Sequence, residues 1–238
     1  MNTKKQTATQ HLFTNKQLRM LLVPIMVEQL LSSLMGTADT MMVSNVGSAA
    51  ISAVSLVDAI NILVIQALSA LAAGGAILCS QYLGSQNLKK AKRSAEQVLF
   101  VMLVLSCSLS LLCLIFRFPL LRLIFGTVDT DVMANSQIYF FFTLLSFPFI
   151  GLYDAGASIL RAQNNTKGPM TISILSNFLN IGGNAILIFV FGMGVAGAAI
   201  ATVLSQLASC VVGFSYMRRR YELLRFSARE LRLDRTAA

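Results

Sequence analysis

The sequence predicts an all-α membrane protein with six transmembrane helices. The chain has 238 residues, of which 55% are hydrophobic and 12% charged, and its mean hydropathy is +0.70. A soluble domain carries about twice that charged fraction. Six apolar runs follow one another, each long enough to cross about 30 Å of hydrocarbon. None shows the charged stripe that a helix of a soluble bundle presents to water.

The six runs span residues 20–44, 50–79, 95–116, 133–157, 169–191 and 194–217. A polar tail, residues 1–19, precedes them. Residues 218–238 form a basic segment, which we expect at the inner membrane surface or at the start of a loop to a further lobe. The first run is too long for a signal peptide, contains two acids and lacks a cleavage site, so we expect it to remain as a helix.

The basic residues predict the orientation in the membrane. Seventeen of the 19 Lys and Arg residues fall on the side of the two termini, and only Arg117 and Arg122 fall on the other. Because positive residues stay in the cytoplasm, we expect both termini inside and the protein in the plasma membrane. This placement accounts for the net charge of +9, so we expect membrane lipid and no nucleic acid as a partner.

The residues that metal centres and enzymes use are sparse. The four Cys residues all lie in apolar runs, without metal-site or disulfide spacing. The single His, His11, lies in the polar tail. We therefore expect no cofactor and no resident metal. A membrane-embedded enzyme with a paired-Asp site at Asp39 and Asp58 stays open as an alternative.

Two acids interrupt the first apolar run. Glu28 and Asp39 are eleven residues apart, which is three helical turns plus about 20°, so both lie on one face. An acid at the centre of a membrane helix costs about 2.5–3.5 kcal/mol. These acids therefore predict a polar interior that the first helix faces.

Other runs carry polar groups at a depth similar to that of Asp39, roughly 7–16 Å from their predicted outer ends at 1.5 Å per residue. They are Asp58, Tyr139, Asn180, Asn184 and Thr202. Five of the six helices thus contribute to one polar layer. Polar groups inside a membrane face either a cavity or one another. We expect this layer to face a cavity.

The run at 169–191 carries a polar stripe. Ser173, Asn177, Asn180 and Asn184 follow helical spacing along one face. Their amide groups suit a cation or a carboxylate, with interhelical hydrogen bonding as the alternative. Glu28 lies deeper and either lines the same cavity or makes a structural hydrogen bond. Asp154 is expected to form an ion pair with Arg161 near the end of its helix.

Small residues and one proline have predictable local effects. The segments LAAGGAI at 71–77 and GMGVAGAAIAT at 192–202 favour close approach of helix backbones. Pro24 removes one hydrogen bond near the start of the first helix and permits bending there.

Taken together, these segments resemble the multidrug and toxic compound extrusion (MATE) transporters. The matching segments are Pro24–Ser44 (P-x₃-E-Q-L…G-T-A-D-T-M-M-V-S), GAILCSQYLG at 75–84, ILRAQNNTKGPM at 159–170, NFLNIGGNAILIF at 177–189 and GMGVAGAAIATVLSQ at 192–206. They occur in the family's order over nearly all of residues 20–217, so the set is specific although each segment alone is weak.

The resemblance implies one six-helix lobe of a two-lobe antiporter that exports small organic cations as H⁺ or Na⁺ enters. It implies a coupling-ion site at positions matching Asp39, Tyr139, Asn180, Asn184 and Thr202. Glu28, Asp58 and Asn177 are further cavity-lining candidates. Some members have Asp where Asn184 stands, so Asp39 is expected to be the main carboxylate and any Na⁺ is expected beside it.

Length departs from the family pattern, because members have about twelve helices. We expect a missing C-terminal lobe, with association of two copies as the other possibility. Alternative functions are a lipid-linked oligosaccharide flippase of the wider superfamily and an inactive transporter fragment. A flippase is expected to line its cavity with Arg and Lys, and this sequence has none at mid-membrane depth.

Overall fold

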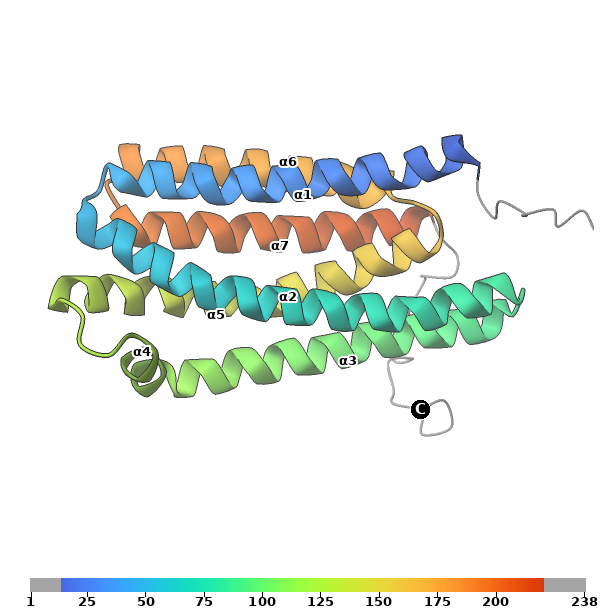
Figure 1. Ribbon diagram of the computed structural model, residues 1–238, viewed down its shortest axis with the longest axis horizontal. Coiled ribbons are helices and arrows are strands. Elements are labelled where there is room, and N and C mark those ends of the chain that lie inside the picture. The colour runs from blue at the N-terminus through green and yellow to red at the C-terminus, as the bar shows by residue number, and fades with distance from the viewer. Residues whose placement is uncertain (1–13, 221–238) are drawn as a thin grey trace, which may run out of the picture.

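The computed structural model describes residues 14–220, and these residues form a bundle of long helices (Figure 1). In chain order the elements are α1 (Asn15–Ser44), α2 (Ser48–Gly84), α3 (Leu88–Ile115), α4 (Arg117–Phe125), α5 (Thr130–Ala162), α6 (Lys167–Asn184), the π-helical segment η1 (Ala185–Val190) and α7 (Gly194–Arg220). The tail before residue 14 and the basic segment after residue 220 lie outside the described residues.

Within the described part of the chain, six helices are long and apolar enough to cross a membrane. They match the six predicted runs, which confirms the fold class. Most begin or end several residues beyond the predicted limits, and α2 reaches 37 residues. The sequence prediction missed α4, a nine-residue helix that ends at Phe125 and is followed by Gly126, where φ is +63°.

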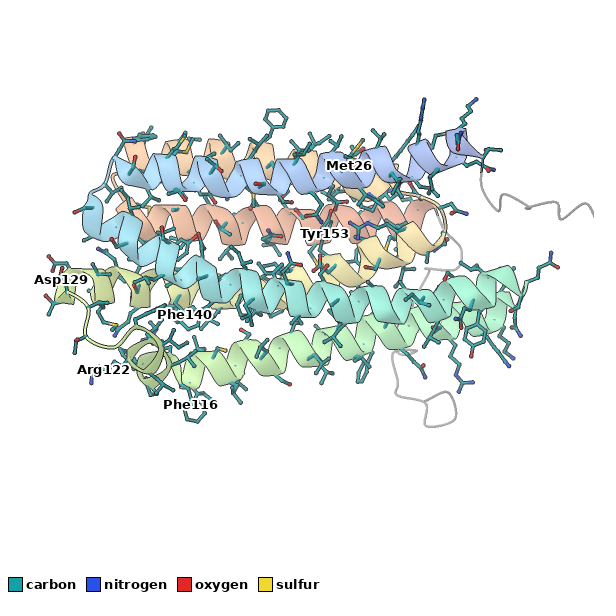
Figure 2. All side chains as sticks on the ribbon, in the orientation of Figure 1. Met26, Phe116, Arg122, Asp129, Phe140 and Tyr153 are labelled. Carbon is teal, nitrogen blue, oxygen red and sulfur yellow. The ribbon has the colours of Figure 1, made fainter. Side chains whose placement is uncertain are left out.

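The two ends of the bundle differ in charge. The start of α1, the α2–α3 turn, the α5–α6 turn and the end of α7 lie at one end, which we call the basic end (Figure 1). Arg122, Asp129 and Phe116 lie at the opposite end (Figure 2). The even number of candidate crossings brings both ends of the described chain to the basic end. That the basic end faces the cytoplasm stays a prediction.

The core forms around α5. This helix packs against α2, α3 and α7 and buries Phe140, Leu144 and Phe147 almost completely. Helices α1 and α6 lie along one side of the bundle and α3 along the other (Figure 1). Helix α5 therefore holds the two sides together.

Helix α1 has few fully buried side chains. Its buried residues are Pro24, Glu28, Asp39 and Val43, and its main neighbour is α6. Their spacing places all four on one face, as predicted for the two acids. Large apolar side chains such as Met26 and Leu34 point outward and are more than half exposed. Lipid is the expected neighbour of this outer face.

Small residues permit the close contact of α2 with α3 that the sequence predicts. A Cβ added at Gly75 would lie 2.5 Å from Val98 Cγ2, whereas one at the adjacent Gly74 would meet no atom within 4 Å. Gly75 therefore sets the distance between these two helices.

The end of α6 departs from regular α-helix directly after Asn184. In η1 the Phe191 N–H donates to the carbonyl of Ile186, five residues back, at 3.1 Å. A π-helical turn inserts an extra residue and changes the direction of the side chains that follow it. Asn184 is thus the last residue of the polar stripe on α6.

Candidate functional site

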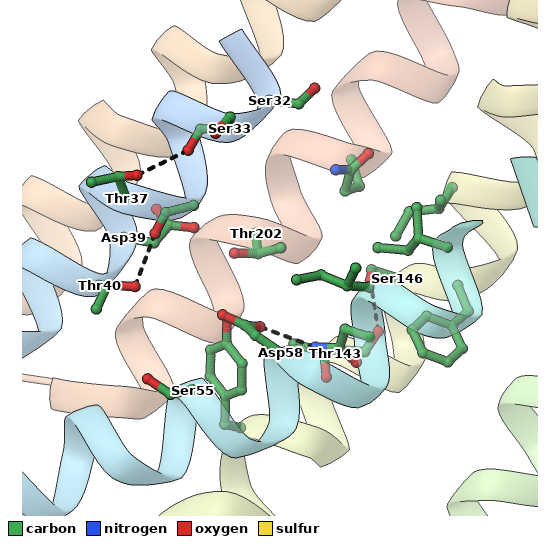
Figure 3. A pocket seen from close by; sticks show the side chains of 18 residues that line it. Ser32, Ser33, Thr37, Asp39, Thr40, Ser55, Asp58, Thr143, Ser146 and Thr202 are labelled. Atoms are coloured by element: carbon green, nitrogen blue, oxygen red, sulfur yellow. Dashed lines mark hydrogen bonds between the residues drawn. The ribbon is translucent and has the colours of Figure 1, made fainter. Parts of the chain in front are cut away.

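A cavity of about 590 Å³ opens between α1, α2, α5 and α7. Figure 3 shows Asp39 of α1, Asp58 of α2 and Thr202 of α7 around it. Tyr139 of α5 also lines it. Four of the residues predicted to share one depth therefore do meet at one cavity.

Asp39 begins a chain of hydrogen bonds across three helices. The Nδ2 group of Asn184 donates to Asp39 Oδ1 and also lies 3.3 Å from Asn180 Oδ1. Asn180 Nδ2 donates to Thr202 Oγ1 at 3.2 Å, and Thr202 Oγ1 donates to the carbonyl of Ala198 at 3.0 Å. Asn180 and Asn184 are fully buried behind the cavity wall. The Asp39 network thus ties α1 to α6 and α7.

Asp58 forms a second, smaller group on the other side of the cavity. Its Oδ1 accepts from Tyr139 Oη at 3.1 Å and from Asn61 Nδ2 at 3.3 Å. The bond from Tyr139 ties α2 to α5, whereas the bond from Asn61 lies within α2. Asp39 and Asp58 lie close enough to interact electrostatically. Two carboxyl groups facing one cavity give it an acidic character that favours positive ligands.

The oxygen atoms of the Asp39 network suit a proton or a small cation. Asn184 uses its amide nitrogen on Asp39, and its Oδ1 is buried without a partner among the described residues. A buried polar atom without a partner is costly, so Asn184 Oδ1, close to the Asp39 carboxylate, would be stabilised by a bound cation. Carboxylate, amide and hydroxyl oxygens are the ligands that hard cations prefer. The residues present therefore fit a coupling ion beside Asp39.

The structure places two of the cavity-lining candidates elsewhere. Glu28 and Asn177 are buried but are not among the residues that line this cavity. Glu28 instead accepts from Arg161 Nη2 at 2.7 Å. Of the two alternatives predicted for Glu28, the structure therefore favours a structural hydrogen bond over a place in the cavity wall. The bond forms because Glu28 lies three turns from Asp39, beside the end of α5.

The predicted ion pair between Asp154 and Arg161 is wrong. Arg161 turns across to Glu28 on α1, and the Oδ2 atom of Asp154 is buried without a hydrogen-bond partner. Helix α5 continues to Ala162, so Asp154 also lies farther from the helix end than expected. Two residues seven apart share a helix face, but an acid on a neighbouring helix can lie closer to the guanidinium.

Hydroxyl side chains that the sequence interpretation passed over also line the cavity. They are Ser32, Ser33, Thr37 and Thr40 on α1, Ser55 on α2, and Thr143 and Ser146 on α5. Several bond only to their own helix, as Thr37 does to the carbonyl of Ser33 at 3.1 Å. Their spacing was a usable signal, because Tyr139, Thr143 and Ser146 follow the same i, i+4, i+7 pattern as the asparagines of α6.

Comparison with known proteins identifies the family of the chain. The family model MatE matches residues 24–186, from Pro24 within α1 to the start of η1. An uncharacterized transporter of Bacillus subtilis, YisQ, is 31% identical over 205 residues, covering 84% of this chain and 44% of that protein. The probable multidrug resistance protein NorM of Thermotoga maritima is 28% identical over 80% of this chain and 42% of its own length.

A solved structure described as the outward-facing conformation of a multidrug resistance MATE family transporter superposes with a TM-score of 0.83. It is 25% identical and is matched over 93% of this chain and 49% of its own. The chain thus spans about half the length of the relatives it matches. Six membrane helices, the match to the family model and these relatives place the chain in the MATE family of membrane transporters.

Proposed function

We propose that the chain is the N-terminal lobe of an antiporter that exports organic cations and other xenobiotics across the plasma membrane in exchange for H⁺ or Na⁺. The observation that carries this proposal is the Asp39 network, which sets an acid and an unpartnered amide oxygen beside an acidic cavity. Relatives described as multidrug resistance proteins support the class of substrate.

The coupling ion and a cationic substrate compete because the negative charge of the cavity attracts both. When Asp39 is ionised and free of an ion, its negative charge and that of Asp58 attract a cationic substrate into the cavity. A proton or Na⁺ that enters from outside neutralises Asp39 and removes much of that attraction. Substrate is then released, while α1, which carries Asp39, repacks against α6 and α7.

The cavity chemistry separates this proposal from a lipid-linked oligosaccharide flippase. Of the described residues that line the cavity, two are acidic and none is Lys or Arg. A pyrophosphate group needs basic partners, so the lining favours a positive substrate.

Transport by a complete protein needs a second lobe. Repeat-built transporters bind substrate between their two repeats, and this chain aligns with about half of each relative. We propose that the partner is a C-terminal lobe, with a second copy of the chain as the other candidate.

Replacement of Asp39 by Asn tests the proposal. Ethidium accumulation is measured in cells that express the chain alone, as a tandem of two copies, or fused to the C-terminal half of a relative. Wherever the wild-type lobe gives efflux that depends on a Na⁺ or proton gradient, the Asp39→Asn variant should abolish it, because Asn cannot carry the charge that the coupling ion neutralises.

Asp129→Asn serves as the matched control, since Asp129 is exposed at the start of α5 and should leave efflux unchanged. Gradient-dependent efflux by the Asp39→Asn variant would rule out the coupling role. Absence of efflux in all three forms would show an inactive lobe.

A further inference from the structure

A second buried polar group lies toward the basic end of the bundle, away from the cavity. Arg161 Nη2 of α5 donates to Glu28 Oε2 of α1 at 2.7 Å, and Glu28 is 7% exposed. Tyr153 of α5 lies in the bundle interior (Figure 2), where its hydroxyl is 3.4 Å from Glu28 Oε1 and 3.1 Å from the carbonyl of Pro169. These contacts fix Glu28 from two directions.

Asp154 belongs to the same group, but no described residue forms a hydrogen bond or ion pair that compensates its carboxyl group. Its Oδ2 atom is buried and lacks a hydrogen-bond partner among the described residues. The charged groups that act on Asp154 are Arg161 on its own helix and Glu28 on α1. The other described helices packed against α5 add no charged group to this set. Arg161 is therefore the positive group that acts on both carboxyl groups, although it bonds only to Glu28.

The count of charges implies a bound proton. Two ionised carboxylates and one Arg would leave one net negative charge in this largely buried group, where an uncompensated charge is disfavoured. A single proton makes the group neutral, and a protonated carboxyl gains an O–H donor. Because Arg161 is engaged by Glu28 in this structure, the proton belongs on Asp154.

We infer that Glu28, Asp154 and Arg161 form a second proton-binding site, separate from Asp39, in which Arg161 pairs with one carboxylate while a proton occupies the other. When the proton leaves Asp154, its ionised carboxylate competes with Glu28 for Arg161. The proton thus decides whether Arg161 remains bound to α1.

The site controls how firmly the first half of α1 is attached. Apart from Pro24, the buried side chain of this half is Glu28. One further bond, from Thr166 Oγ1 to the carbonyl of Met20 at 3.2 Å, ties it to the α5–α6 turn. Loss of the proton should therefore loosen α1 between Met20 and Glu28, and gain of the proton should tighten it. Only the use of this movement in transport rests on the proposed function.

Hydrogen exchange of the 238-residue chain in lipid nanodiscs tests the inference without substrate or gradient. The measured quantity is the protection factor of α1 amides at 21–28, corrected for intrinsic exchange at each pH. In the wild type we expect protection to fall roughly tenfold as pH rises, the size expected for one charge-assisted hydrogen bond. Asp154→Asn should keep protection high at every pH, because its neutral amide does not compete as a charge for Arg161.

Two control variants separate this site from the Asp39 network. Asp39→Asn and the exposed Asp129→Asn should retain the pH response of α1. A wild-type protection factor that does not change with pH, or a response that survives in Asp154→Asn, would overturn the inference. Either result leaves the transport test at Asp39 unaffected, so failure of this site and failure of the proposed function are distinguishable.

Infrared spectroscopy gives an independent measure. The difference spectrum between the wild type and Asp154→Asn should contain the carbonyl stretch of a buried protonated carboxyl, in addition to any band that Asp39 or Asp58 gives in both proteins. Glu28→Gln should also remove this band although Asp154 is intact, because Arg161 is then free to pair with an ionised Asp154. Persistence of the band in Glu28→Gln would contradict the exchange of Arg161 between the two acids.

Discussion

Asp39 and Glu28 lie on the same face of α1 but have different kinds of partner. Asp39 accepts from the neutral amide of Asn184, whereas Glu28 accepts from the guanidinium of Arg161. A neutral donor leaves the charge of Asp39 uncompensated and available to a mobile ion. A fixed positive partner compensates Glu28 and makes it structural while the pair is intact.

Removal of the Asn184 side chain should weaken the fold through Asp39. In Asn184→Ala the carboxylate loses its donor, and a buried charged group without a partner costs about 1–3 kcal/mol. Thermal unfolding of the chain in detergent should show a lower midpoint. The deficit should shrink at low pH, where a protonated Asp39 no longer carries the charge.

Asn177→Ala is the comparison for this variant, because Asn177 lies on the same stripe of α6 and its Nδ2 atom has no partner in the structure. Its loss should change the midpoint little. Equal destabilisation by the two variants would contradict a special role for Asn184.

Residue identity in the Asp39 network was largely predictable, but residue pairing was not. Helical spacing and depth predicted one polar layer, which contains Asp39, Asp58, Tyr139, Asn180, Asn184 and Thr202. Nothing in the spacing states that Asn184 bonds to Asp39 while Asp58 bonds to Tyr139. Likewise the choice of Arg161 between Asp154 and Glu28 depends on how closely α1 approaches α5, which is a tertiary property.

At the scale of elements, the long helices were predictable from apolar length, and the irregular ones were not. Helix α4 has nine residues and is too short to stand out beside an adjoining run. The π-helical turns of η1 depend on packing against α7, where Gly197 allows the backbone of Leu187 to approach. Boundaries differ because helices extend past the hydrocarbon into the interface.

The contact between α2 and α3 provides a test with two adjacent glycines. In Gly75→Ala the new methyl group would overlap Val98, whose branched side chain has little freedom to move. We expect a loss of about 1–3 kcal/mol in the free energy of unfolding, as for other overpacked interfaces. Denaturation of the purified chain in detergent measures it.

Gly74→Ala makes the same chemical change one residue earlier, where open space is present. It should be neutral or stabilise the protein by about 0.4–1 kcal/mol, because alanine restricts the unfolded chain. If both variants behaved alike, close packing at Gly75 would not be the cause.

For the whole molecule, charge distribution predicts a topology that accessibility can measure. We expect the basic end to face the cytoplasm. A Cys introduced at Thr127, in the exposed turn after α4, should react with a membrane-impermeant maleimide added to intact cells. A Cys at Ser85, in the exposed α2–α3 turn, should react only after permeabilisation. The reverse pattern would invert the orientation.

The limited burial of α1 affects how the bundle responds to its surroundings. Pro24 and Val43 are the fully buried apolar side chains of α1, and others such as Met42 are half-buried, but lipid and not water is expected to replace the bundle around them. The heat-capacity change of that separation should therefore be small. Temperature and denaturant will act on the packed core around α5, whereas protons and ions will act on α1. One lobe thus combines a core whose stability depends on temperature with a helix whose position depends on the concentrations of protons and ions.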